Sequence, residues 1–276
     1  MADDASHRLP AIGQVPVSQP ARVTVTLQSG TARGMINLTR DGAIVTIALG
    51  RPEARNAVPI SAWQALAAAA DEVGDARAVI LRSDVPGIFS AGADVREFEA
   101  LQSDASLRVR FRTAMRDGIE ALAALPMPVI AAVDGGCFGA AVALILAADI
   151  RVAGDRAEFA TTPARLGLGY PQQDVARLAT QVGKGVAALM LFTGDRLVPD
   201  EAKRIGLVEL RAKKAVDTAT ELASAIAANA PGAVRLLKRM LRGGEGGDRA
   251  FDDAFGGMEF AEGLAAFRER RKPLYR

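Results

Sequence analysis

Residues 126–141 read PMPVIAAVDGGCFGAA, and this stretch decides the fold. Val129 to Val133 is short, apolar and β-branched at both ends, which is typical of a buried strand. Cys137 to Ala148 is apolar all round and predicts a buried helix. The apolar run between Asp134 and Asp149 holds several glycines and is shorter than the roughly 20 residues of a membrane-spanning helix. We therefore expect a buried strand and helix here, and no membrane span.

The chain before this stretch carries further strand and helix patterns. Met35 to Leu38 and Ala43 to Leu49 are strand-like, and the Asp41-Gly42 pair between them predicts a hairpin. The other expected elements are a helix over 59–73, a buried strand over 78–81 and a helix over 104–125 that stops before Pro126.

Beyond residue 149 the strand patterns give way to helical patterns alone. Short strands are expected over 150–153 and 157–159, and helices over 186–192, 216–229, 232–241 and 251–271. This order indicates an α/β core with a C-terminal helical appendage. We divide the chain into an N-terminal extension, an α/β core and a C-terminal helical region, which cover residues 1–33, 34–210 and 211–276. The extension is expected to be mostly disordered, with one strand over Val23 to Leu27.

Charge and rare residues exclude several functions. The formal net charge of +2 provides no strong field for nucleic acid. The single cysteine, Cys137, excludes an internal disulfide and fits a reducing compartment, so we expect a cytoplasmic protein. The one histidine, His7, lies in the N-terminal extension, which argues against Ser–His or Cys–His catalysis and against a histidine-rich metal site.

Several short motifs, taken in order, resemble the crotonase (enoyl-CoA hydratase/isomerase) superfamily. They are RPEARNA at 51–57, FSAGAD at 89–94, the stretch at 126–141, PDEA at 199–202, IGLV at 205–208, and the end of the chain around Glu262, Phe267 and Arg270. The resemblance implies a spiral of strand–strand–helix units whose C-terminal helices serve assembly into a trimer or a dimer of trimers. It also implies an acyl-CoA thioester as substrate, with coenzyme A as part of that substrate and no metal or further cofactor.

Small residues mark the expected catalytic site. A thioester that becomes an enolate puts negative charge on its carbonyl oxygen, and preorganised N–H groups stabilise that charge. The resemblance implies that the donors are the N–H groups of Ala93 and Ala140. Ala91 and Gly139 let backbone approach the ligand closely. Without the resemblance, tight packing at a strand–helix turn explains the same small residues.

Two positions depart from the family pattern. Hydratases of the family carry two glutamates that activate water and move a proton, and the matching positions here are Ala143 and Pro163. Neither residue can exchange a proton. The resemblance therefore does not carry the two-glutamate hydration mechanism to this chain.

The segment from Thr161 to Tyr170 offers an alternative. Its T-P-x-x-L-G-x-x-Y pattern is similar to methylmalonyl-CoA decarboxylases of the same superfamily, in which the matching tyrosine lies against the acyl group. Those enzymes have His where this chain has Ala93. Tyr170 is therefore a candidate catalytic residue, and Asp174 is the best acidic candidate if the enzyme moves protons. Arg165 is a candidate partner for a substrate carboxylate, and a surface role explains it equally well.

The remaining candidate residues can also be explained by purely structural roles. Asp94 is expected to cap the helix that starts at Val95, as well as being a possible acid. The ligand contacts that the resemblance implies are Arg55, Ala91, Asp94, Val95, Gly139, Ala143, Pro163, Phe267 and Arg270. In crotonases the region of Phe267 and Arg270 touches coenzyme A bound to a neighbouring subunit, whereas a solvated helix end explains these residues equally well.

Three functions stay open from the sequence. The first is an enoyl-CoA hydratase/isomerase-like lyase or isomerase with an atypical acid. The second is an acyl-CoA decarboxylase or thioester hydrolase, and the third is an acyl-CoA-binding protein that has lost catalysis. The sequence does not give the acyl group.

Overall fold

The computed structural model describes residues 23–25 and 34–275 of the chain. The expected disorder over residues 1–33 lies mostly outside this part. Of the strand expected over 23–27, the described portion is β1 (Val23–Val25), which pairs antiparallel with β2 (Ile36–Asp41). The N-terminal extension therefore contributes an outer strand to the sheet.

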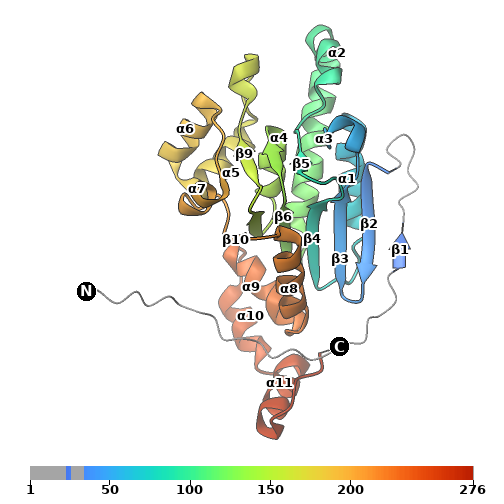
Figure 1. Ribbon diagram of the computed structural model, residues 1–276. Coiled ribbons are helices and arrows are strands. Elements are labelled where there is room, and N and C mark those ends of the chain that lie inside the picture. The colour runs from blue at the N-terminus through green and yellow to red at the C-terminus, as the bar shows by residue number, and fades with distance from the viewer. Residues whose placement is uncertain (1–22, 26–33, 276) are drawn as a thin grey trace.

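A seven-stranded sheet forms the centre of the molecule (Figure 1). The hairpin of β2 and β3 (Ile44–Leu49) is confirmed, with Asp41 paired to Ile44, so that the turn is Gly42-Ala43 and not Asp41-Gly42. Gly42 has φ 57°, a backbone conformation that suits glycine at this turn. The strands that follow run parallel to β3, in the order β4 (Ala78–Ser83), β6 (Val129–Val133), β8 (Ile150–Gly154) and β10 (Leu210–Ala212).

A second sheet holds three short parallel strands in the order β5 (Ile88–Ser90), β7 (Gly136–Phe138) and β9 (Glu158–Ala160). Each follows a strand of the large sheet along the chain. The chain therefore visits the large sheet, then the small sheet, and then a helical segment, three times in succession. This is the expected spiral of strand–strand–helix units.

Two long helices cover one face of the large sheet. Helix α1 (Ile60–Asp71) packs against α3 (Ala105–Ala124), and Figure 1 shows them beside each other. A Cβ on Gly118 would lie 2.8 Å from the carbonyl oxygen of Trp63, so glycine is needed at this crossing. The Asp104 side chain caps α3 by accepting from the N–H groups of Ser106 and Leu107. Helix α3 ends at Ala124, and the expected helix over 104–125 is confirmed.

The stretch at 126–141 folds differently from the expectation. Cys137 lies in strand β7, and the helix that follows, α4, is confined to Ala140–Ile145. The expected helix over 137–148 is therefore wrong at both ends. An apolar run without periodicity fits a buried strand as well as a buried helix. Gly135 and Gly139, at φ 124° and 52°, allow the chain to turn before and after β7. Burial raises the pKa of the Cys137 thiol, as expected of a packed, unreactive side chain.

Short helical elements surround the small sheet. After β5 come the 3₁₀ helix η3 (Val95–Glu97) and α2 (Phe98–Ser103). After β9 come the 3₁₀ helix η4 (Pro163–Leu166), α5 (Gln172–Val182), α6 (Lys184–Thr193) and α7 (Pro199–Arg204). Helix α6 confirms the helix expected over 186–192. These elements build the walls of the site described below.

The C-terminal helices gather at one end of the molecule in Figure 1. Helix α8 (Ala215–Ala227) covers the other face of the large sheet, where its alanines pack on Ile80, Ile130 and Val152. Helix α9 (Pro231–Leu241) follows. The single helix expected over 251–271 is two helices, α10 (Gly247–Ala254) and α11 (Met258–Glu269), because Gly256 and Gly257 interrupt it. The division at residue 210 stays a prediction.

Candidate active site

A cavity of about 440 Å³ lies where β5 and β7 end and η4 and α5 begin. Its walls come from four parts of the chain, and most of its lining is apolar. The lining residues are Ala91, Ala93, Val95, Phe98, Phe111, Arg112, Met115, Gly139, Ala140, Ala143, Thr162, Pro163, Leu166, Leu168, Gly169, Tyr170, Pro171 and Asp174. Nine of the thirteen candidates from the sequence are among them.

The loop after β5 is fixed by a buried polar network. The Asn56 side chain donates to the Phe89 carbonyl at 3.0 Å, and the Ser90 hydroxyl donates to the Asn56 carbonyl at 2.6 Å. The Ala91 N–H donates to the Arg55 carbonyl at 3.0 Å, and the Gly92 N–H donates to the Ser90 hydroxyl oxygen at 3.0 Å. Buried polar groups that are fully bonded hold a single geometry, so this loop is rigid before any ligand arrives.

The N–H group of Ala93 points away from this network. Val58 donates to the Gly92 carbonyl at 2.8 Å and accepts from the Asp94 N–H at 3.2 Å, which is the pattern of a parallel bridge centred on Ala93. Backbone groups alternate in direction along extended chain, so the Ala93 N–H faces the opposite side from Val58. It donates to no group of the described chain. This amide is therefore available to a ligand in the cavity.

The N–H group of Ala140 is held by its own peptide unit. The Gly139 carbonyl, in the same peptide, accepts from the Val142 N–H at 2.9 Å and from the Tyr170 hydroxyl. In a trans peptide the C=O and N–H point in opposite directions. The two bonds therefore orient the Ala140 N–H, which has no acceptor among residues 34–275. The Tyr170 hydroxyl therefore bonds the peptide unit that carries this amide.

The two amides belong to segments that touch. A Cβ built on Gly92, which has φ +93°, would lie 2.5 Å from the Phe138 carbonyl oxygen and 3.1 Å from the Ala140 nitrogen. A side chain at position 92 would force these segments apart. Glycine is thus required for the Ala91–Ala93 turn to lie against the start of α4.

Asp174 brings a carboxyl group into the cavity from the first turn of α5. It is buried, at 5 % exposure, and its nearest cation is Arg177 at 3.8 Å, which is too long for a hydrogen bond. Arg177 instead bonds the Glu120 carboxylate. Burial, together with the nearby negative charge of Glu120, raises the pKa of Asp174 to about 6, and Arg177 only partly opposes this shift. Asp174 is the one acid among the described residues that line the cavity.

Ala143 and Pro163 both line the cavity, and neither bears a titratable group. Tyr170 is no substitute base, because burial and the nearby Asp174 raise the pKa of its phenol. Arg165, the sequence candidate for a substrate carboxylate, does not line the cavity and bonds Asp195 at 3.1 Å instead. The structure therefore supports a surface role for Arg165.

Besides Arg165, four sequence candidates lie outside the cavity lining. Arg55 is exposed and contributes its carbonyl to the loop network. Asp94 is buried and caps η3, and its bonds to Arg96 and Arg51 outweigh burial and hold its carboxyl pKa below the usual range, so it is a structural anion. Phe267 is an exposed side chain of α11, and Arg270 ends that helix in a left-handed conformation. Any ligand contact of these last two stays a prediction.

Helices α2 and α3 supply cavity residues that the sequence did not single out. They are Phe98 from α2 and Phe111, Arg112 and Met115 from α3. The spacing of 111, 112 and 115 places these three on adjoining parts of one helix surface, which is the signal that was available. That this surface faces a cavity depends on tertiary packing.

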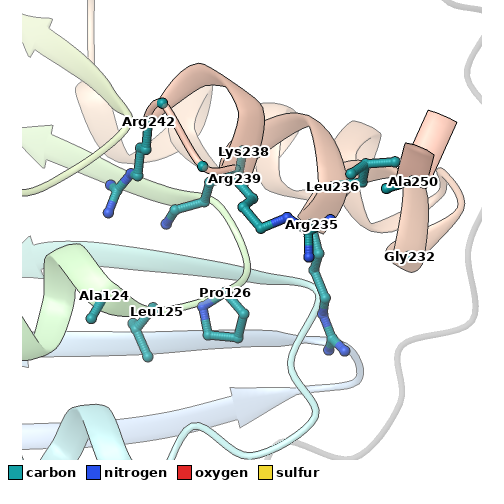
Figure 2. A pocket seen from close by; sticks show the side chains of 12 residues that line it. Ala124, Leu125, Pro126, Gly232, Arg235, Leu236, Lys238, Arg239, Arg242 and Ala250 are labelled. Carbon is teal, nitrogen blue, oxygen red and sulfur yellow. The ribbon is translucent and has the colours of Figure 1, made fainter. Parts of the chain in front are cut away.

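A second cavity, of about 590 Å³, lies under α9 and has a different character. Figure 2 shows Arg235, Lys238, Arg239 and Arg242 projecting from α9 on the side where Ala124, Leu125 and Pro126 lie. Lys238 and Arg242 both bond the Asp149 carboxylate at 2.7 Å, and Lys238 also donates to the Met127 carbonyl at 2.7 Å. This cluster joins α9 to the core, and Asp149 is a structural anion within it.

The spiral α/β fold and the free backbone N–H groups at its strand–helix turns are the features by which the chain can be compared with known enzymes. The enoyl-CoA hydratase/isomerase family model matches residues 39–276. The chain belongs to this family, and so to the crotonase superfamily that its motifs resemble.

Individual relatives of known sequence or structure support the same family assignment. The chain is 37% identical over 256 residues to the human mitochondrial enoyl-CoA hydratase domain-containing protein 2, covering 85% of this chain and 86% of that protein. It is 31% identical over 255 residues to the mouse mitochondrial methylglutaconyl-CoA hydratase, covering 84% and 79%. The crystal structure of an enoyl-CoA hydratase/isomerase family protein from Hyphomonas neptunium superposes with a TM-score of 0.84 at 33% identity, covering 88% of this chain and 99% of that one.

Two of these relatives are named as mitochondrial, so the cytoplasmic location stays a prediction. None of the helices in the described part of the chain is long and apolar enough to cross a membrane.

Proposed function

We propose that the protein forms the enolate of an acyl-CoA thioester in the 440 Å³ cavity and moves the proton with Asp174. The N–H groups of Ala93 and Ala140 would both donate to the enolate oxygen, which is the role that the family resemblance implies for them. Their orientation, their lack of acceptors in the described chain and the close approach of their segments support this role. Coenzyme A enters as part of the substrate, without a metal or further cofactor.

The observation that carries the proposal is the single carboxyl group. Adding water to a double bond requires one group to activate the water and a means of protonating the carbon, which the family's two glutamates provide. One carboxylate with a pKa near 6 is enough to remove a proton and return the same proton elsewhere. We therefore favour a double-bond shift over hydration.

The proposed step balances without a co-reactant. The Asp174 carboxylate takes a proton from C2 of a 3-enoyl thioester, and the electron pair of that C–H bond forms a dienolate. The protonated Asp174 returns the proton to C4, and the double bond moves to C2–C3. The product is the conjugated 2-enoyl thioester.

The test uses 3-hexenoyl-CoA in heavy water, with the conjugated thioester followed by its absorbance and deuterium uptake by mass spectrometry. We expect saturable formation of the 2-enoyl product and its loss in Asp174→Asn. Rapid, saturable addition of water to crotonyl-CoA would contradict the proposal and would agree with the hydratases among the relatives.

Methylmalonyl-CoA in the same assay tests the decarboxylase alternative, which the 161–170 motif favours. Loss of CO₂ that persists in Asp174→Asn would replace the proton-shuttle proposal, because decarboxylation generates the enolate without a base. Free coenzyme A would indicate a hydrolase. Tight binding of thioesters without any product would indicate the non-catalytic alternative.

We also propose that the C-terminal helices mediate assembly into a trimer or a dimer of trimers. Large apolar side chains are exposed on them, as expected of an association surface: Leu237, Leu241, Phe251, Phe255, Met258 and Phe267. Phe251 stacks edge-on with Phe255, so part of this surface is already ordered. Light scattering at micromolar concentration should give a trimeric or hexameric mass, and a monomer would contradict the proposal.

A further inference from the structure

Arg112 is a cation in the 440 Å³ cavity that we propose holds the acyl group (the acyl cavity), and it has no counterion among the described residues. It lines the cavity, its side chain is exposed, and it makes no ion pair or hydrogen bond within residues 34–275. The next arginines along the same face behave differently. Arg108 donates to the Leu101 and Gln102 carbonyls at 2.7 and 2.6 Å, and Arg116 pairs with Asp117 at 2.9 Å.

The acids near Arg112 are committed elsewhere. The two acids of α3 are Asp117, which pairs with Arg116, and Glu120, which pairs with Arg177. Asp174 lines the same cavity but forms no ion pair with Arg112. The cavity therefore presents one cation and one anion that do not neutralise each other.

The surroundings of Arg112 favour a planar anion. Phe111, Met115 and Leu168 line the same cavity and offer apolar surface to the carbon chain of a bound acyl group. A guanidinium presents N–H groups in a fork that matches a carboxylate. Met115 stands three residues along α3, so the cation lies about one helical turn from a buried apolar wall of the cavity.

We propose that Arg112 selects acyl-CoA substrates that carry a carboxylate at the far end of the acyl group. The proposal rests on the proposed function and narrows its substrate class. Asp174 supports the terminal position, because its ionised carboxylate repels a second carboxylate held beside the carbon it deprotonates. Ala93, Ala140 and Arg112 line the same cavity, so the terminal carboxylate would bind Arg112 while the thioester end binds the two amides.

Calorimetry with inert saturated thioesters tests the proposal without turnover. The matched pairs are glutaryl-, adipyl- and suberyl-CoA against pentanoyl-, hexanoyl- and octanoyl-CoA, at neutral pH. We expect the best-fitting member with a carboxylate to bind about 10- to 100-fold more tightly than its neutral partner, which is the range for a hydrogen bond to a charged group. Arg112→Met should abolish this preference and leave the neutral thioesters within about twofold. Arg112→Lys should keep part of it, because charge remains and the fork is lost.

Arg116→Met is the matched control, since Arg116 lies one turn along α3 and outside the cavity lining. It should leave the preference intact. Equal binding of both members of every pair would overturn the proposal. A loss of affinity for free coenzyme A in Arg112→Met would also overturn it, because Arg112 would then read the coenzyme's phosphates. A preference confined to methylmalonyl- over propionyl-CoA would place the carboxylate beside the thioester. If no thioester binds, the proposed function fails as well, whereas tight neutral binding without preference overturns this inference alone.

Discussion

The charges in the acyl cavity and the charges beneath α9 are arranged in opposite ways. Under α9, Lys238 is 6 % exposed and shares the Asp149 carboxylate with Arg242, at 2.7 Å from each. In the acyl cavity, Arg112 has no partner within the described chain and Asp174 has only a 3.8 Å contact with Arg177. The charges beneath α9 neutralise one another, whereas the exposed Arg112 and the buried Asp174 do not pair with each other.

This difference separates structural charges from functional ones. A partner within the fold stabilises an ion and fixes its charge state. A carboxyl group that is buried without one has a raised pKa and remains able to exchange a proton near neutral pH. Removing a charge should therefore reduce activity in the acyl cavity and stability beneath α9.

The largest effect is expected for Asp174→Asn. If Asp174 is the general base, kcat/KM for 3-hexenoyl-CoA should fall about 10²- to 10⁴-fold. The wild-type rate should rise with pH through about 6 and level off above it, because the base must be ionised. The variant should lack this rise. Asp117→Asn, an exposed acid on α3, is the control and should leave the profile unchanged.

Gly92→Ala tests the uncharged half of the site. The added Cβ meets the Phe138 carbonyl oxygen at 2.5 Å, so the turn must move away from α4 and the two amides separate. Activity should fall about 10²- to 10³-fold, the range for losing one oxyanion donor. Gly87→Ala is matched in its positive φ of 74°, and its Cβ would meet nothing within 4 Å. Equal losses in both variants would assign the effect to backbone strain alone.

Asp149→Asn tests the paired charges. It leaves Lys238 buried without its counterion, so the free energy of unfolding should fall by about 3 kcal/mol in urea titrations, with activity of the folded fraction preserved. Asp155→Asn removes an exposed pair with Arg211 and should cost less than about 1 kcal/mol. Comparable small losses in the two variants would remove the distinction drawn between the charges in the acyl cavity and those beneath α9.

Asp174→Asn should also change stability, in the opposite direction to activity. The folded pKa of about 6 lies above the ordinary value of 3.8 for an aspartate, so the folded state retains a proton that the unfolded state loses. Stability therefore decreases as pH rises from about 4 to about 6. The variant escapes this loss and should be about 3 kcal/mol more stable at about pH 8, with no gain near pH 3. A variant less stable than wild type at the higher pH would show that the carboxylate is well compensated.

The smallest effect is expected for Tyr170→Phe. The Gly139 carbonyl keeps its bond from Val142 and loses the one from the phenol, so the Ala140 amide is loosened and not displaced. We expect kcat to fall about 10-fold with KM nearly unchanged, the behaviour of an interaction made in the transition state. A raised KM with unchanged kcat would instead place the phenol against the substrate.

Local signals made much of the fold predictable. The β2–β3 hairpin, α3 with its stop before Pro126, and α6 follow from turn residues and periodicity over short windows. Strand β7 did not, because an apolar run without periodicity has no preferred secondary structure until its neighbours β5 and β9 pair with it. The sequence pattern over 251–271 predicted one helix, whereas Gly256 and Gly257 divide this segment into two helices.

The part of the site that is formed by backbone groups was predictable from the sequence. Ala91, Ala93, Gly139 and Ala140 were identified because motif order carries them, and they line one cavity. Arg112, which lines the cavity, was missed, and Arg165, which does not, was put forward as the partner of a substrate carboxylate. The two arginines look alike in sequence, and the difference is that Arg165 pairs with Asp195 whereas Arg112 pairs with no acid of the described residues.

The face of the large sheet that α8 covers has a consequence for synthesis on the ribosome. Ile80, Ile130 and Val152 come from three strands made early, whereas the alanines that cover them lie at 215–223. The Asp134 carboxylate likewise waits for the N–H groups of Ala215 and Val216, to which it bonds at 2.9 and 3.1 Å. At about 5–20 residues per second, this apolar face stays open for several seconds after its strands emerge. The nascent chain is therefore most prone to aggregation late in translation, and it leaves that state only when α8 docks.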